Sequence, residues 1–281
     1  MHEMQCTQSD QGDQMQKMRL QTSAHEVEGK QRMSVEQYLT DVITTDGAAH
    51  LTLIDPDAQA PSEASGIAEA AATAGSSAIM IGGSVGASGD LLDETVRAIR
   101  SVTDLPTILF PASACGICRY ADAVFFMSLL NSRDMNYLIG NQMLGAKVVL
   151  EYGIEPIPMA YIIVEPGGTA GWIGDAKMIP RDKPELAAAY SLAGTFLGMR
   201  YTYLEAGSGA DEPVPPEMIR AVKSAGCGTL VVGGGIRDRE TARAAVRAGA
   251  DIIVTGTAIE ETSDIQTTIT EFVHAIKKVI S

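Results

Sequence analysis

The sequence lacks a long apolar run, a rich supply of cysteine and an excess of positive charge. No apolar run reaches the roughly 18 residues of a membrane-spanning helix, so we expect no transmembrane segment. Four cysteines in a chain of 281 residues do not make a disulfide framework, which predicts reduced thiols and a cytoplasmic protein. The formal net charge of −14 argues against nucleic acid and anionic membrane surfaces as partners.

The first part of the chain differs in composition from the rest. Residues 1–33 are rich in Gln, Met, Ser and charged side chains and show no sustained apolar period. Such a segment has too little apolar surface to form a core, so we expect a disordered N-terminal extension there. Residues 34–281 are expected to form a single domain, and α/β barrels often reach this length.

From residue 50 onward, strand patterns alternate with helical patterns. Short, continuously apolar segments such as Ala78–Ile81 are typical of parallel strands that are buried on both faces. Eight of them predict a (β/α)8 barrel, or TIM barrel. A doubly wound sheet fits less well, because Asp55–Asp57 follows the first strand in place of a glycine fingerprint. The predicted strands cover residues 50–55, 78–82, 106–111, 123–129, 158–164, 200–206, 228–233 and 251–255. The predicted helices cover residues 35–44, 62–74, 90–102, 132–152, 183–198, 215–225, 238–248 and 264–280.

One connection is too short for the regular barrel pattern. Only about ten residues, Ala112 to Asp122, separate the third strand from the fourth, whereas a crossover helix needs about a dozen or more. We therefore expect the third helix to be lost or reduced, which would thin one wall of the barrel into a groove. Met127, Met135 and Met143 flank this wall and are interpreted as core packing or as a surface for a flexible apolar ligand.

The last three strands each run into small, glycine-rich residues. These segments are Tyr201–Gly209, Thr229–Ile236 and Asp251–Thr257. Glycines at strand ends let backbone N–H groups approach an anion, and a following helix N-terminus adds positive potential. The loops after strands seven and eight are the usual phosphate site of a TIM barrel. The pattern predicts a phosphorylated small molecule as ligand.

Carboxylates stand at two predicted strand ends, where barrel active sites are built. Asp55 could bind Mg²⁺ together with Ser84 at the end of the neighbouring strand, or it could cap the helix near Pro61. Glu205 precedes the glycines of the sixth strand and is interpreted as a general base, or as a carboxylate bonded to neighbouring backbone N–H groups.

A glycine-rich segment follows the fifth strand. Residues 167–174 contain four glycines and lead to Lys177 and Arg181. We interpret them as a mobile active-site loop that brings two cations to a second anionic group. The alternative is a flexible surface loop with solvated charges.

Five motifs appear together in the order and spacing of one known family. They are Leu53–Asp57, Ile81–Ser84, Tyr203–Gly209, Gly233–Ile236 and Val254–Thr257. With them, residues 35–281 resemble geranylgeranylglyceryl phosphate synthases, the barrel prenyltransferases of archaeal lipid synthesis, which have bacterial heptaprenylglyceryl phosphate synthase relatives. Residues 171–181 resemble the corresponding loop of the family's second, mostly archaeal group. The short third connection agrees with the family pattern, and the N-terminal extension departs from it.

The resemblance implies a Mg²⁺-dependent transfer of a prenyl group. The 3-hydroxyl of sn-glycerol 1-phosphate would attack the first carbon of geranylgeranyl diphosphate and release pyrophosphate. Asp55 and Ser84 would bind Mg²⁺, and Lys177 and Arg181 would meet the prenyl diphosphate. The helical prenyl synthases' DDxxD motif is absent. Glu205, as base, and Tyr203 would be catalytic. The residues implied for glycerol phosphate are Tyr203, Leu204, Glu205, Ala206, Gly207, Ser208, Gly209, Gly234, Gly235, Gly256 and Thr257.

The family resemblance implies a homo-oligomer, either a dimer or a hexamer.

Two other functions would use the same glycines. A phosphosugar isomerase or lyase on a TIM barrel would bind phosphate in the same place. A non-catalytic phospholigand-binding protein would keep the glycines without needing Asp55, Ser84 and Glu205 together.

Overall fold

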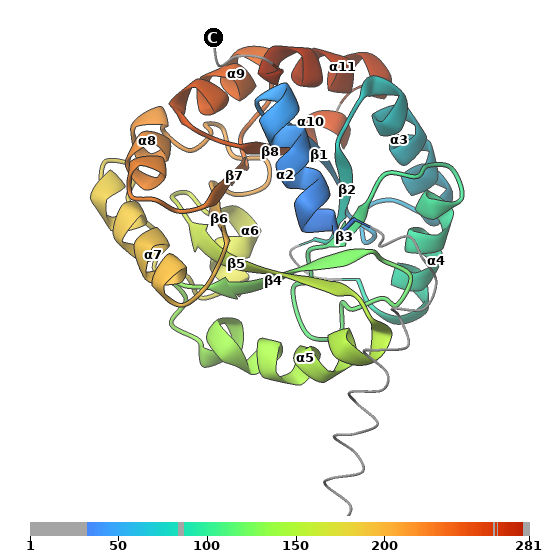
Figure 1. Cartoon of the computed structure of the whole chain (residues 1–281), viewed down its shortest axis with the longest axis horizontal. Helices are drawn as coiled ribbons and strands as arrows, with labels where there is room; N and C mark the ends of the chain where they lie inside the picture. The colour runs from blue at the N-terminus through green and yellow to red at the C-terminus, as the bar shows by residue number, and fades with distance from the viewer. Residues whose placement is uncertain (1–32, 84–86, 261, 263, 278–281) are drawn as a thin grey trace, which may run out of the picture. The chain divides into compact units, whose positions relative to one another are not determined.

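Eight parallel strands close into a barrel in which each strand pairs with its neighbours in chain order (Figure 1). The computed structural model describes residues 33–83, 87–260, 262 and 264–277. Pairing of Ala49 with Ile252 closes the barrel between its first and last strands. The predicted TIM barrel is therefore confirmed. Its strands are β1 (Ala49–Ile54), β2 (Ala78–Ile81), β3 (Thr107–Leu109), β4 (Ala123–Leu129), β5 (Glu155–Ile163), β6 (Tyr201–Glu205), β7 (Thr229–Gly233) and β8 (Ile252–Thr255).

Helices surround the barrel except on one side (Figure 1). Residues 110–122, which join β3 to β4, form turns and no helix, so the predicted loss of the third helix is confirmed. Short helices follow β5 and β8 at the C-terminal ends of the strands. The helices are α2 (Val35–Asp46), α3 (Pro61–Ala74), α4 (Gly89–Arg100), the π-helix η1 (Asn136–Gly140), α5 (Asn141–Tyr152), α6 (Gly168–Ile173), α7 (Pro184–Phe196), α8 (Pro216–Ser224), α9 (Arg239–Ala248), α10 (Thr257–Glu260) and α11 (Ile265–Ile276).

The segment expected to be a loop after β5 contains a short helix. Gly168–Ile173 forms α6, although glycine has a low helix propensity. A Cβ atom on Gly171 would lie 3.2 Å from the Ile163 side chain, so a small residue lets this helix pack closely on the barrel. Tertiary packing therefore overrides local propensity here.

The barrel interior is a packed core and not a channel. Alternate residues of each strand point inward, and those of the lower layers, including Leu51, Ile157 and Tyr201, are fully buried. Helix α2 closes the N-terminal end of the barrel through Leu39 and through hydrogen bonds from its first backbone N–H groups to Glu155. A ligand can therefore reach the interior only from the C-terminal ends of the strands.

Among the residues that the structure describes, none of the helices has the length and apolar character that crossing a bilayer requires.

Candidate active site

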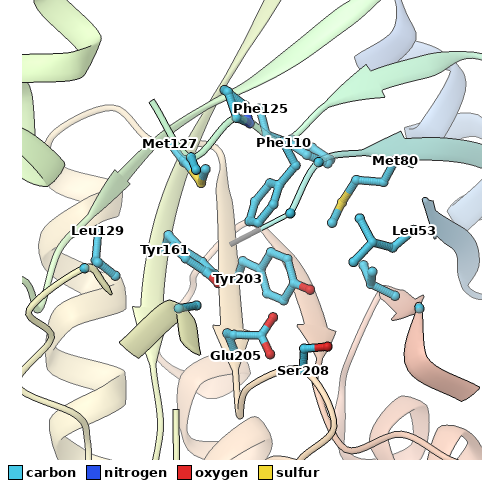
Figure 2. Close-up of a pocket in the computed structure, with 18 of the residues that line it drawn as sticks. Leu53, Met80, Phe110, Phe125, Met127, Leu129, Tyr161, Tyr203, Glu205 and Ser208 are labelled. Atoms are coloured by element: carbon cyan, nitrogen blue, oxygen red, sulfur yellow. The ribbon is translucent and has the colours of Figure 1, made fainter. Parts of the chain in front are cut away.

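A cavity lies over the C-terminal ends of the strands and extends along the wall that lacks a helix (Figure 2). Its two ends differ in chemistry. One end is formed by Glu205, Ser208 and the glycines that follow β7 and β8. The other end is apolar and is formed by residues 110–114 with the inner side of η1 and α5. The cavity thus joins a polar site to an apolar groove.

The polar end is built by the loops that follow β6, β7 and β8. The hydroxyl groups of Ser208 and Thr257 lie 3.0 Å apart and connect the first of these loops to the start of α10. Both residues line the cavity, as do Gly209, Gly234 and Gly256. The structure therefore brings together the strand ends that the sequence indicated as a phosphate site.

Gly234 and Gly235 are required by the packing of these loops. Both have positive φ angles, 77° and 69°, which side chains rarely adopt. A Cβ atom on Gly234 would meet the Glu205 carboxylate and would lie 2.6 Å from the Gly207 nitrogen. One on Gly235 would lie 2.6 Å from the Glu212 carbonyl. Loop packing therefore explains both glycines, and their contact with a phosphate stays a prediction.

Glu205 is a buried carboxylate at the end of β6 with only 7% of its surface exposed. Its Oε1 atom accepts a hydrogen bond of 2.6 Å from the Gly207 N–H. Burial raises the pKa of Glu205, while the hydrogen bonds from Gly207 and from the Tyr203 side chain act to lower it. Glu205 was interpreted as a general base or as a carboxylate bonded to backbone N–H groups. The two interpretations are compatible, because the carboxylate that accepts the backbone hydrogen bond also lines the cavity. A raised pKa suits a proton acceptor that works near neutral pH.

Three aromatic rings separate the polar end from the barrel core. The centroids of Tyr161 and Phe110 both lie close to that of Tyr203, at 5.3 and 5.4 Å, and Figure 2 shows all three above Glu205. Sequence reasoning missed Phe110 and Tyr161. Strand register was the signal that was available, because Tyr161 pairs with Tyr203 in the barrel.

Asp55 lies where β1 ends and faces a glycine of the next strand end. Its Oδ1 atom accepts a 2.9 Å hydrogen bond from the Asp57 N–H, and a Cβ atom on Gly83 would collide with its carboxylate. Asp55 does not cap α3, since Glu63 reaches back to the Ala60 N–H at 3.0 Å and closes that helix end.

The surroundings of Asp55 fit a divalent cation. Burial raises the pKa of the Asp55 carboxyl, and the charges of Asp57 and Glu260 raise it further. No group of three His, Cys, Asp or Glu side chains within the described ranges could hold a metal by itself. Mg²⁺ commonly uses one or two carboxylates and completes its shell with water and substrate oxygens, which is the arrangement that remains available. Ser84, the second predicted ligand, lies outside the described residues.

The two predicted diphosphate cations do not line the cavity. Lys177 is exposed. Arg181 donates a 2.8 Å hydrogen bond to the Pro213 carbonyl and pairs with Glu212 at 3.1 Å, so it ties the loops after β5 and β6 together. Their binding of a diphosphate stays a prediction. Arg237, which sequence reasoning missed, does line the cavity and donates to the Gly209 carbonyl at 2.8 Å.

Two proteins with similar sequences are both named geranylgeranylglyceryl phosphate synthase. The chain is 62% identical over 247 residues to the geranylgeranylglyceryl phosphate synthase of Methanococcoides burtonii, covering 88% of this chain and all of that one. It is 59% identical over 231 residues to that of Pyrococcus abyssi, covering 82% and 92% of the two chains.

Two solved structures are similar to this chain to different degrees. The crystal structure of (S)-3-O-geranylgeranylglyceryl phosphate synthase from Thermoplasma acidophilum in complex with sn-glycerol-1-phosphate matches with a TM-score of 0.85 and 42% identity, over 88% of this chain and 99% of that one. Thiamine phosphate pyrophosphorylase from Pyrococcus furiosus, covering 84% of this chain and 98% of its own, shares only the fold, with a TM-score of 0.55 and 16% identity. The PcrB family model matches residues 40–276, which is most of the chain. The chain therefore belongs to the PcrB family.

Proposed function

We propose that this protein is a prenyltransferase that joins geranylgeranyl diphosphate to the 3-hydroxyl of sn-glycerol 1-phosphate. The products are geranylgeranylglyceryl phosphate and pyrophosphate. The observation that carries the proposal is the two-ended cavity, whose polar end suits a small phosphate and whose apolar end suits a lipid tail. The names of the relatives and the glycerol phosphate complex of the Thermoplasma acidophilum protein support it.

Glycerol phosphate would bind at the polar end. Its phosphate would meet backbone N–H groups and hydroxyls of the loops after β6, β7 and β8, including Ser208 and Thr257. Its 3-hydroxyl would then lie against Glu205. Tyr203 would hold the Glu205 carboxylate in place through its side-chain hydrogen bond.

The transfer requires one proton to leave the hydroxyl and one carbon–oxygen bond to break. Glu205 would accept the proton from the 3-hydroxyl as that oxygen bonds to the first carbon of the prenyl group. The bond from this carbon to the diphosphate oxygen breaks, and its electron pair leaves with pyrophosphate. Glu205 is buried, and substrates that fill the cavity would keep water away from the reacting carbon.

Asp55, with Ser84 as the second expected ligand, would hold Mg²⁺ beside the diphosphate. The ion would supply charge neutralisation for the leaving group. Lys177 and Arg181 stay candidates for diphosphate binding, and Arg237 joins them because it lines the cavity. A homo-oligomer, either a dimer or a hexamer, and a cytoplasmic location are part of the same proposal, and light scattering and cell fractionation would test them.

A single assay separates this function from the alternatives. Purified protein is incubated with labelled sn-glycerol 1-phosphate, geranylgeranyl diphosphate and Mg²⁺, and the label is followed into organic solvent. We expect a lipid-extractable product that disappears when EDTA is added. A phosphosugar isomerase or lyase, or a binding protein, would leave all of the label in water.

The tail should follow the helix-free wall, and a large side chain there should limit its length. Ala112 and Ala114 line the apolar end of the cavity. We expect Ala112→Trp and Ala114→Trp to shift the preference between farnesyl and geranylgeranyl diphosphates toward the shorter chain by about tenfold or more. Competition between the two diphosphates measures the ratio.

The matched control for chain length is Ala189→Trp, which adds the same ring to an exposed position on α7. It should leave the ratio unchanged. The KM for glycerol phosphate should also stay close to the wild-type value in all three variants. If neither wall variant changes the ratio, the tail lies elsewhere.

A further inference from the structure

Met135 and the helical segment that follows it, η1 and α5, carry five exposed apolar side chains. They form what we call the α5 ridge, and their exposed fractions range from 56% for Ile139 to 66% for Met143. A cluster of exposed apolar side chains of this kind usually marks an interaction site. The residues of the ridge are Met135, Ile139, Met143, Leu144 and Leu150.

The ridge has no net charge, in contrast to the chain as a whole. Residues 135–152 contain two charged side chains, Lys147 and Glu151, and these two pair with each other at 3.6 Å. The complete chain has a formal net charge of −14. An anionic surface repels an acidic protein, whereas a zwitterionic surface does not. The neutral apolar face therefore suits an uncharged apolar partner.

The same helical segment also forms a wall of the cavity. Gly145 and Val149 line the apolar end from α5, and Tyr137 and Asn141 line it while remaining partly exposed. A single layer of helix therefore separates the ridge from the groove. The ridge and the groove are two sides of one element.

We infer that the α5 ridge docks this protein on the surface of a lipid bilayer. This inference rests on the proposed function, in which both the prenyl substrate and the product carry a twenty-carbon tail. Transfer of such a tail through water costs free energy for every methylene exposed. Docking places the groove next to the membrane, so that the tail enters and leaves with little contact with water. Methionine and branched aliphatic side chains adapt readily to a lipid surface.

Vesicle flotation tests the inference without any substrate. The full-length protein is mixed with vesicles of neutral phosphatidylcholine or of anionic phosphatidylglycerol. We expect it to float with the neutral vesicles and less with the anionic ones. The double variant Ile139→Glu/Met143→Glu should lower the partition coefficient by about tenfold or more, and Leu144→Glu provides a second test if the double variant does not fold.

The matched control places acidic residues on exposed apolar positions at the end of α7. Phe196 and Leu197 are 79% and 73% exposed, and Phe196→Glu/Leu197→Glu should float as the wild type does. The inference is overturned if the wild type does not float or if the control loses as much binding as the ridge variant. It is also overturned if the ridge variant only dissociates an oligomer in light scattering, because the ridge would then bind a second copy.

Turnover separates this inference from the proposed function. The ridge variants should use geranylgeranyl diphosphate in detergent micelles at a rate within about twofold of wild type and use vesicle-embedded substrate about tenfold more slowly. Equal rates in both presentations would contradict docking. Absence of product from wild-type protein in either presentation would contradict the proposed function and leave the flotation result as it is.

Discussion

Replacing Glu205 with Gln should lower kcat by about 10²–10⁴-fold, the usual contribution of a general base. Gln keeps the shape of the side chain and can still accept the Gly207 hydrogen bond, but it cannot take up a proton. The KM for glycerol phosphate should change much less. Steady-state kinetics of both substrates measures the two effects, and Glu165→Gln, at an exposed carboxylate next to β5, is the matched control.

The pKa of Glu205 adds a pH test to this prediction. Because burial raises this pKa, the acid limb of kcat/KM should lie above the ordinary Glu value and should vanish in Glu205→Gln. The raised pKa also affects the stability of the fold, because the charged form of Glu205 is the unfavourable form in the folded state. A raised pKa in the folded state means that stability is greatest when Glu205 is protonated and falls as the pH rises through the folded-state pKa. Glu205→Gln should therefore have an equal or higher Tm at pH 8, with a smaller difference at pH 4. An unchanged kcat combined with a lower Tm at pH 8 would make Glu205 a purely structural carboxylate.

Replacing Asp55 with Asn should reduce turnover by more than about 10²-fold, because changes even in the outer shell of metal sites cost 10–100-fold. The change removes the charge that would hold Mg²⁺ and keeps the side chain's volume. It also removes repulsion from Asp57 and Glu260, so the Tm should not fall. Activity measured as a function of Mg²⁺ concentration tests the prediction.

Two further variants show whether the effect comes from the position of the Asp55 carboxylate. Gly83→Ala should displace this carboxylate, because the added Cβ atom would collide with it, and should raise the Mg²⁺ concentration needed for half-maximal activity. Asp57→Asn, at an exposed neighbour, should have little effect. Near-normal activity of Asp55→Asn at low Mg²⁺ would show that Asp55 is not a ligand.

The barrel could be predicted from the sequence because its strands are short apolar segments with regular spacing. All eight predicted strands are present, and the third connection was too short for a helix. The start of β5 was missed, since Pro156 and Pro158 lack the N–H group expected within a sheet. In the structure both prolines lie in β5 and stand opposite residues of β4 in the parallel pair that these two strands form.

The site was predictable where a strand end carries its own motif and not where two segments meet in space. Glu205 and Asp55 stand directly after apolar strands. Gly235, in contrast, was expected to make room for a phosphate, and its neighbour in the structure is the Glu212 backbone from another loop. That contact depends on how two loops pack, which local sequence does not encode. The role of Arg181 as a tie between loops depends on tertiary packing in the same way.

The missing third helix has a consequence for how the domain is completed. On β7, outward-facing side chains such as Val232 are covered by helices, whereas Phe126 on β4 is only partly buried and lines the groove. Under the proposed function, the prenyl tail covers this part of the strand when it binds. The substrate thus takes the structural place of a helix, and its binding free energy is coupled to the folding of this wall.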